Sequence, residues 1–241
     1  MNPLVVPPPA PVPAHAAEAG AAVVLVNPNT STTTTAMMAA IARRSLTRQA
    51  GPGRAVRGVT VARGPGMLTD PAALRAAAPE VLAAGLRAAA GGDCAGLVVA
   101  AFGDPGVEEL RAAVGVPVVG IGEAALAEAA AHGVPYGIAT TTPLLADTIA
   151  ERVEALGHAD RYTGVRLTAG APERLSADPA LLLDRLERAV RACVERDGAR
   201  AVVIGGGPLG EAAEELRARC RIPVIAPIAA AMTAITHLLG R

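Results

Sequence analysis

Four short segments hold the side chains of this chain that could contact a small ligand. Each follows an apolar run and is rich in Asn, Thr, Ser or Gly: NPNTS at 27–31, AFGDPG at 101–106, TTTP at 140–143 and GGGP at 205–208. Hydroxyls, side-chain amides and free backbone N–H groups can hold a compact carboxylate, amide or imide. We therefore expect these segments to form a small-molecule site.

Ionisable groups are scarce near these segments. Asp104 lies in the second of them, and we expect its carboxylate to cap the turn and helix that follow its own strand. Glu123 opens a helix, where a carboxylate interacts favourably with the helix dipole. Thr140, Thr141 and Thr142 fit either a carboxylate-binding turn or a simple helix cap. The pattern provides binding groups but no obvious acid or base.

The cysteines and histidines show no catalytic or metal-binding spacing. Cys94, Cys193 and Cys220 form no CxxC pair, which is typical of a reduced, cytoplasmic protein with small buried thiols. Cys94 lies about 23 Å before Ala101 if the chain between them rises ~3.3 Å per residue as a strand. Cys220 precedes its strand and Cys193 falls within a helix, so we expect none of the three at the site. The histidines are scattered and suggest no metal site.

Two kinds of pattern alternate along the chain and predict an α/β fold. Short apolar runs without alternation are typical of strands buried on both faces, and these lie at 21–26, 56–62, from 97 onward, 116–120, 136–139, 164–168, 201–205 and 222–226. Helical patterns lie between them, at 36–44, 71–90, from 107 onward, 124–131, 144–156, 178–197, from 214 onward and 229–239. We expect residues 32–35 to belong to the loop before the first helix. In parallel sheets a ligand lies beyond the carboxyl ends of the strands, which is where the four polar segments fall.

The composition excludes several function classes. Lys plus Arg and Asp plus Glu both number 22, every basic residue is Arg, and aromatic residues make up 1% of the chain. This balance argues against nucleic-acid binding, and the lack of Lys excludes Schiff-base chemistry on lysine. No GxGxxG or GxxxxGK[ST] motif follows a strand, so we expect no nucleotide cofactor.

The N-terminal segment also informs the expected location. Residues 1–20 are rich in Pro and Ala and lack the basic and continuous apolar parts of a signal peptide. We expect a flexible tail there, and no apolar run approaches the ~18 residues that a membrane-spanning helix needs. These features predict a cytoplasmic protein that binds no membrane, with a homo-oligomer left open.

An internal repeat indicates two similar halves. Residues 98–101 match 203–206 at an offset of 105, and 117–119 match 223–225 at an offset of 106, in the same order of elements. We predict two lobes, each with a parallel four-stranded sheet and helices around it. Lobe 1 is expected at 21–122 together with a C-terminal helix at 228–241, and lobe 2 at 123–227.

The motifs resemble those of a known enzyme family. VLVNPNTS at 24–31, AFGDPG at 101–106, PVVGIGEAA at 117–125 and ATTTP at 139–143 are similar to the hydantoin and allantoin racemase branch of the aspartate/glutamate racemase superfamily, in order from about residue 22 to the end. The resemblance implies two flavodoxin-like lobes related by a pseudo-two-fold axis, with the substrate between them and no cofactor. It also implies racemisation next to a carbonyl, by one cysteine that removes the proton and another that returns it.

The chain departs from that pattern at both cysteines. The resemblance places them at Ala101 and Gly206, two positions that the internal repeat also pairs. A methyl group and a hydrogen atom cannot transfer protons, so the two-thiol mechanism is excluded and the catalytic residues stay unknown. For substrate binding we expect the residues that end the strands: Asn27, Asn29, Thr30, Ser31, Ala101, Phe102, Gly103, Thr140, Thr141, Thr142, Gly206 and Gly207.

Three functions are consistent with these residues. The first is a racemase or isomerase-type enzyme that acts next to a carbonyl of a small carboxylate, hydantoin or imide, or a cofactor-free decarboxylase or cyclase on the same scaffold. The second is a small-ligand-binding protein without catalysis. A flavodoxin-like module that binds a nucleotide or flavin is the third, and it is based on fold analogy alone.

Overall fold

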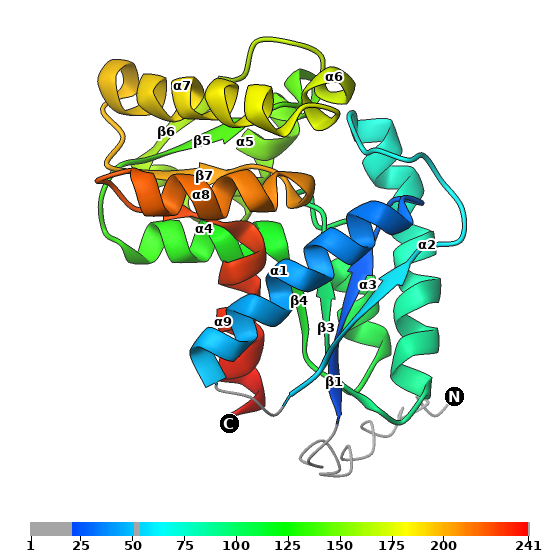
Figure 1. The fold of residues 1–241 in the computed structure, drawn as a ribbon. Coiled ribbons are helices and arrows are strands. Elements are labelled where there is room, and N and C mark those ends of the chain that lie inside the picture. The colour runs from blue at the N-terminus through cyan, green and yellow to red at the C-terminus, as the bar shows by residue number, and fades with distance from the viewer. Residues whose placement is uncertain (1–20, 51–53, 241) are drawn as a thin grey trace, which may run out of the picture.

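A computed structural model describes residues 21–50 and 54–240. The expected tail at 1–20 lies outside these residues. The chain forms two parallel four-stranded sheets of identical strand order, β2-β1-β3-β4 and β6-β5-β7-β8, so the predicted α/β fold with two similar lobes is confirmed (Figure 1).

The first sheet contains β1 (Ala22–Asn27), β2 (Val56–Thr60), β3 (Cys94–Val99) and β4 (Val118–Gly120). Helices α2 (Pro71–Ala90) and α3 (Val107–Ala113) cover one face, and α1 (Thr32–Ala50) and α9 (Pro227–Leu239) cover the other. The apolar run of β1 serves both faces, because Val24 and Val26 pack beneath α2 while Val23 and Leu25 face α1. This explains a strand without polar alternation.

The second sheet contains β5 (Tyr136–Thr140), β6 (Tyr162–Leu167), β7 (Ala201–Ile204) and β8 (Val224–Ile225). One face packs against α7 (Pro179–Asp197) and α8 (Gly210–Arg219), and the other against α4 (Ile121–Ala131) and α5 (Ala146–Ala155). Short helical turns complete the chain: η1 (Pro143–Leu145), η2 (Ala159–Arg161), α6 (Pro172–Ser176) and η3 (Gly207–Leu209).

The first helix begins earlier than expected. Residues 32–35 were predicted as loop, but α1 starts at Thr32 and runs to Ala50. Ser31 caps it, since its Oγ accepts a hydrogen bond from the Thr34 N–H at 3.2 Å. The hydroxyl of Thr35 lies 3.1 Å from the Ser31 carbonyl and that of Thr34 donates to Ser31 Oγ at 2.9 Å, so these two threonines have partners in the first turn.

One of the hydrophobic clusters is shared by the two lobes. Helix α4 follows β4 yet packs against β7 and β8 of the second sheet, and α9 follows β8 yet packs against β3 and β4 of the first. The two helices also contact each other, and side chains from both lobes form a single buried cluster around them. Surface ion pairs between α1 and α8, such as Arg44–Glu211 at 2.8 Å, add contacts across the lobes. The residue boundaries proposed for the lobes stay a prediction.

Candidate functional site

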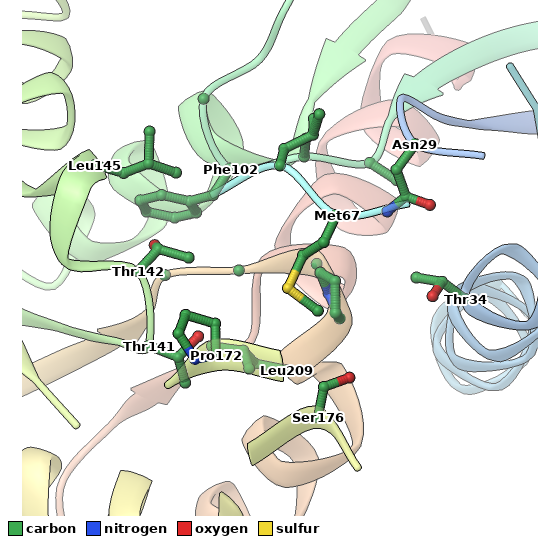
Figure 2. Close-up of a pocket in the computed structure, with 18 of the residues that line it drawn as sticks. Asn29, Thr34, Met67, Phe102, Thr141, Thr142, Leu145, Pro172, Ser176 and Leu209 are labelled. Carbon is green, nitrogen blue, oxygen red and sulfur yellow. The ribbon is translucent and has the colours of Figure 1, made fainter. Parts of the chain in front are cut away.

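A cavity of about 720 Å³ opens between the two lobes, where β3, β5 and β7 end. Three strand-end segments line it: Ala101 to Gly103, Thr141 to Thr142, and Gly205 to Leu209. Figure 2 shows Phe102, Thr142 and Leu209 around this space, with Met67 reaching into it. The predicted residues that line the cavity are Asn29, Ala101, Phe102, Gly103, Thr141, Thr142, Gly206 and Gly207.

The other predicted binding residues do not line the cavity. Asn27 is fully buried, and its Nδ2 donates to Asn29 Oδ1 at 2.8 Å and to Thr35 Oγ1 at 2.9 Å. Thr30 N–H donates to the Pro65 carbonyl at 3.1 Å, which fixes the loop after β2. These groups shape the loop and do not line the cavity.

Ser31 and Thr140 are also used within the protein. Ser31 caps α1, as described above. Thr140 is buried, and its hydroxyl donates to the Gly205 carbonyl at 2.7 Å, which ties the end of β5 to the end of β7. Polar residues at strand ends therefore divide into those that face the cavity and those that join the segments behind it.

Gly207 allows the two lobes to meet at the cavity. A Cβ at this position would lie 2.7 Å from the Ala100 carbonyl oxygen and 2.9 Å from Met38 Sδ, both in the other lobe. A backbone oxygen cannot move aside without disturbing β3, so a side chain here would separate the lobes. The third glycine of GGGP thus brings the end of β7 against the end of β3.

Asp104 holds the segment after β3 in place, but in a way that differs from the expectation. Its carboxylate accepts hydrogen bonds from the N–H groups of Gly122 at 2.8 Å and Glu123 at 2.7 Å, so it caps α4. The helix that follows its own strand, α3, has Gly106 at its N-cap and no side-chain cap. The predicted local cap is therefore wrong, because the carboxylate is engaged by N–H groups at the start of α4. Asp104 has φ 48°, a left-handed conformation that Asp tolerates.

A guanidinium from the second lobe completes this cluster. Arg152 of α5 places Nη2 3.2 Å from Asp104 Oδ2 and 3.6 Å from Glu123 Oε2. Glu123 accepts a hydrogen bond from the Gly120 N–H at 3.0 Å, as its position at the start of α4 suggests. Its carboxylate also pairs with Arg111 at 2.5 Å. Burial raises the pKa of Asp104 to about 7, although the two N–H donors and Arg152 act in the opposite direction.

The thiols lie away from the cavity, as the sequence predicts. Cys94 begins β3 at the opposite end of the strand, Cys193 lies in α7, and Cys220 directly follows α8. None of them is among the lining residues. Burial raises the pKa of Cys193 to about 12 and raises the pKa of Cys94 and of Cys220. Within the described residues no group of His, Cys, Asp or Glu could hold a metal ion.

Much of the cavity wall comes from residues of predicted helices that the sequence did not assign to the site. Apolar side chains predominate, and these include Met37, Leu74, Leu145, Ile149, Leu182 and Leu183. They belong to helical faces whose apolar residues equally suit a core position, so no local signal separates the two roles. The ionisable residues of the wall are Glu151, Arg152, Glu211 and Glu215.

Hydrogen-bond donors remain free at two of the strand ends. The backbone N–H groups of Phe102, Gly103, Thr141 and Thr142 have no acceptor among the described residues. All four residues line the cavity. Such donors, fixed by the strands that precede them, are suited to an oxygen that gains negative charge during a reaction.

The comparison with known proteins agrees with this geometry. A model of the Asp/Glu/hydantoin racemase family matches residues 23–235, which include both sheets and every segment of the cavity described above. The chain belongs to this family. The resemblance noted from the motifs is thereby confirmed.

Hydantoin and allantoin racemases are among the similar members of the racemase family. A hydantoin racemase from Paenarthrobacter aurescens is 28% identical over 143 residues, 59% of this chain and 61% of that protein. The chain thus spans about three fifths of that relative's length. Structures of allantoin racemases from Klebsiella pneumoniae and Pseudomonas fluorescens are 29% and 28% identical, both with a TM-score of 0.83, and cover 91% and 90% of this chain and 88% and 90% of theirs.

The positions that the resemblance assigns to the family's two thiols line one cavity in this chain. Ala101 follows β3 in one lobe and Gly206 follows β7 in the other. A Cβ at Gly206 would lie 3.0 Å from two side-chain carbons of Leu209, which also lines the cavity. Both positions are therefore placed to contact a ligand, but neither residue has a group that moves a proton.

Proposed function

We propose that this chain is an isomerase-type enzyme that acts at the carbon next to a carbonyl of a small carboxylate, hydantoin or imide. The observation that carries the proposal is the cavity between Ala101 and Gly206, with free N–H donors at two strand ends. Family membership and the names of the hydantoin and allantoin racemases support the substrate class.

The free donors define what the protein contributes to such a reaction. When the proton leaves the carbon, negative charge moves to the carbonyl oxygen, and the N–H groups of Phe102 and Gly103 or of Thr141 and Thr142 stabilise that charge. One well-placed donor of this kind is worth about 3 kcal/mol of barrier. The donors are preorganised by β3 and β5, so they do not need to reorganise during the step.

Proton transfer must use groups other than thiols. Among the described residues of the wall, the carboxylates of Glu151, Glu211 and Glu215 are the groups that could accept a proton, together with bulk water. Glu211 pairs with Arg44 and Glu215 with Arg219. A single base and solvent return of the proton would give racemisation without a cysteine pair.

The test follows the α-proton directly. Enantiopure 5-methylhydantoin and 5-benzylhydantoin are incubated in D₂O, and deuterium uptake and loss of optical rotation are compared with the protein-free rate. We expect both to exceed that rate in the wild type and to fall to it in Ala101→Phe, which places a ring where the substrate would lie beside the end of β3. Ala112→Phe, the same change at an exposed position of α3, is the matched control and should retain activity.

A second function is favoured by one specific observation. No thiol, imidazole or amine lines the cavity among the described residues, so the chain is also suited to bind such a ligand without turning it over. In that case a thermal shift with the hydantoins appears without isotope exchange. A cofactor-free decarboxylase or cyclase would instead release CO₂ or a cyclised product from a malonate or open-chain panel.

Introducing thiols at positions 101 and 206 tests whether the rest of the site supports racemisation. The double variant Ala101→Cys with Gly206→Cys should gain racemase activity of at least tenfold over the wild type. The Leu209 side chain must shift by a few tenths of an ångström to admit the second thiol, because of the 3.0 Å approach. No gain in a folded double variant would argue against a racemase site in this cavity.

A further inference from the structure

Arg152 has more hydrogen-bonding capacity than the protein uses. Its guanidinium carries five N–H groups, and only Nη2 contacts acceptors, namely Asp104 and Glu123. Nε is buried and has no acceptor among the described residues. Nε has almost no accessible surface, so Nη1 is the unpaired nitrogen that a partner from outside the chain can reach.

Arg152 lies where a ligand in the cavity can contact it. The residue lines the cavity, and its side chain is 25% exposed. Among the described lining residues it is the one positively charged side chain. The same helix also presents Thr148, Ile149 and Glu151 to the cavity, so Arg152 is the cationic group of a wall that also holds a hydroxyl and a carboxylate. Figure 2 shows Leu145 close to Phe102, which lies two residues before Asp104.

The hydrogen bonds of the cluster fix the orientation of the guanidinium. Asp104 is fully buried and is held by two N–H groups of α4, so it gives Nη2 a rigid anchor. Glu123 is shared with Arg111, which supplies its main counter-charge. With one nitrogen anchored, the remaining N–H groups keep a fixed direction. Nη1 has no acceptor among the described residues, so its two N–H groups can donate to a carboxylate oxygen.

We propose that Arg152 is a ligand-binding residue that selects ligands carrying a carboxylate, through N–H groups that Asp104 and Glu123 leave free. This deepens the proposed function, on which it rests, by naming a chemical group of the ligand. A hydantoin with an acidic side chain would use both groups of donors. Its ring suits the strand-end N–H groups, and its carboxylate would contact Arg152 of α5.

Arg152 also joins the two lobes, and the experiment must separate this structural role from ligand binding. Hydantoin-5-acetic acid and hydantoin-5-acetamide have the same ring and nearly the same shape, and they differ in charge. Their dissociation constants are measured by calorimetry for the wild type, Arg152→Met, Arg152→Lys and the control Glu154→Gln, an exposed residue of the same helix.

In the wild type we expect the acid to bind at least tenfold more tightly than the amide, as a charge-assisted hydrogen bond provides. Arg152→Met should bring the ratio of the two dissociation constants close to one. Arg152→Lys should give an intermediate ratio, and Glu154→Gln should leave the ratio unchanged. If Arg152→Met does not fold, the ratio in Arg152→Lys decides, because a lysine keeps the charge without the directed guanidinium N–H groups. A ratio equal to that of the wild type would then contradict the proposal.

Two results would overturn the proposal. Equal affinity for acid and amide in the wild type would show that Arg152 does not select a carboxylate. An equal loss for both ligands in Arg152→Met would assign the residue to lobe packing alone. Either result leaves the proposed function in place if the amide binds and its α-proton exchanges. If neither ligand binds the wild type, both proposals fail.

Discussion

The buried carboxylate of Asp104 predicts an unusual dependence of stability on pH. Its side chain has no exposed surface, and burial raises its pKa from 3.8 to about 7. Between these two values the unfolded chain has lost the proton while the folded chain still holds it. The folded state therefore binds more protons, and the free energy of unfolding falls as pH rises. Above about pH 7 both states are ionised, and this contribution becomes constant.

The magnitude follows from the size of the pKa shift. One group that titrates only in the unfolded state changes stability by about 1.4 kcal/mol per pH unit at most. From 3.8 to about 7 this gives an upper limit of about 4 kcal/mol for the loss. Other groups titrate in this range, so we consider the difference in the free energy of unfolding between the wild type and Asp104→Asn. The contributions of the other groups cancel in this difference.

The assay is urea unfolding followed by far-UV circular dichroism, since the chain contains no Trp. We expect the stability of the wild type minus that of Asp104→Asn to decrease from pH 4 to 7 and then to level off. Arg152→Met should extend the decrease to higher pH, because Arg152 lowers the pKa of Asp104. A difference that is flat or that rises with pH would show that the N–H donors and Arg152 outweigh burial, and the reasoning would be refuted.

Three further predictions concern single contacts. Gly122→Ala should destabilise the protein by about 3 kcal/mol or more in urea unfolding, because its Cβ would lie 2.0 Å from the Phe102 carbonyl oxygen; a loss under 1 kcal/mol would contradict this. Tyr136→Phe should cost about 1 kcal/mol in the same assay, since the hydroxyl donates to a backbone carbonyl at 2.9 Å, and no loss would mean that the hydroxyl is not needed. Arg44→Ala should cost less than about 1 kcal/mol, because its pairing with Glu211 is half exposed, and the effect should shrink further at high salt.

The order of elements could be predicted from the sequence, because it depends on local patterns. Uniformly apolar runs such as that of β1 mark strands covered on both faces, and the matched halves indicate two similar sheets. The ends of two elements differ from those expected. The Thr-rich start of α1 suggested a loop, because a low helix propensity is visible in the sequence whereas the hydrogen bond from Thr35 to Ser31 is not. The strand expected at 222–226 shrank to Val224–Ile225.

The sequence also located the strand-end segments of the site but not the role of each polar residue in them. Asn27 and Thr140 have the same character as Asn29 and Thr141, yet the first pair is buried in hydrogen bonds behind the cavity wall. Which member of such a pair faces a ligand depends on the direction of one side chain at the end of a strand. A pattern of residue types does not contain that direction.

Local sequence therefore determined the strands, the repeat and the absence of a thiol at Ala101 and Gly206. Tertiary structure alone decided that Asp104 caps α4, and that Arg152 from the other lobe reaches the same carboxylate. The physical reason is how far apart along the chain the interacting residues lie. Secondary structure and strand ends follow from neighbours a few residues apart, whereas the cavity wall forms only when two lobes pack around a common core.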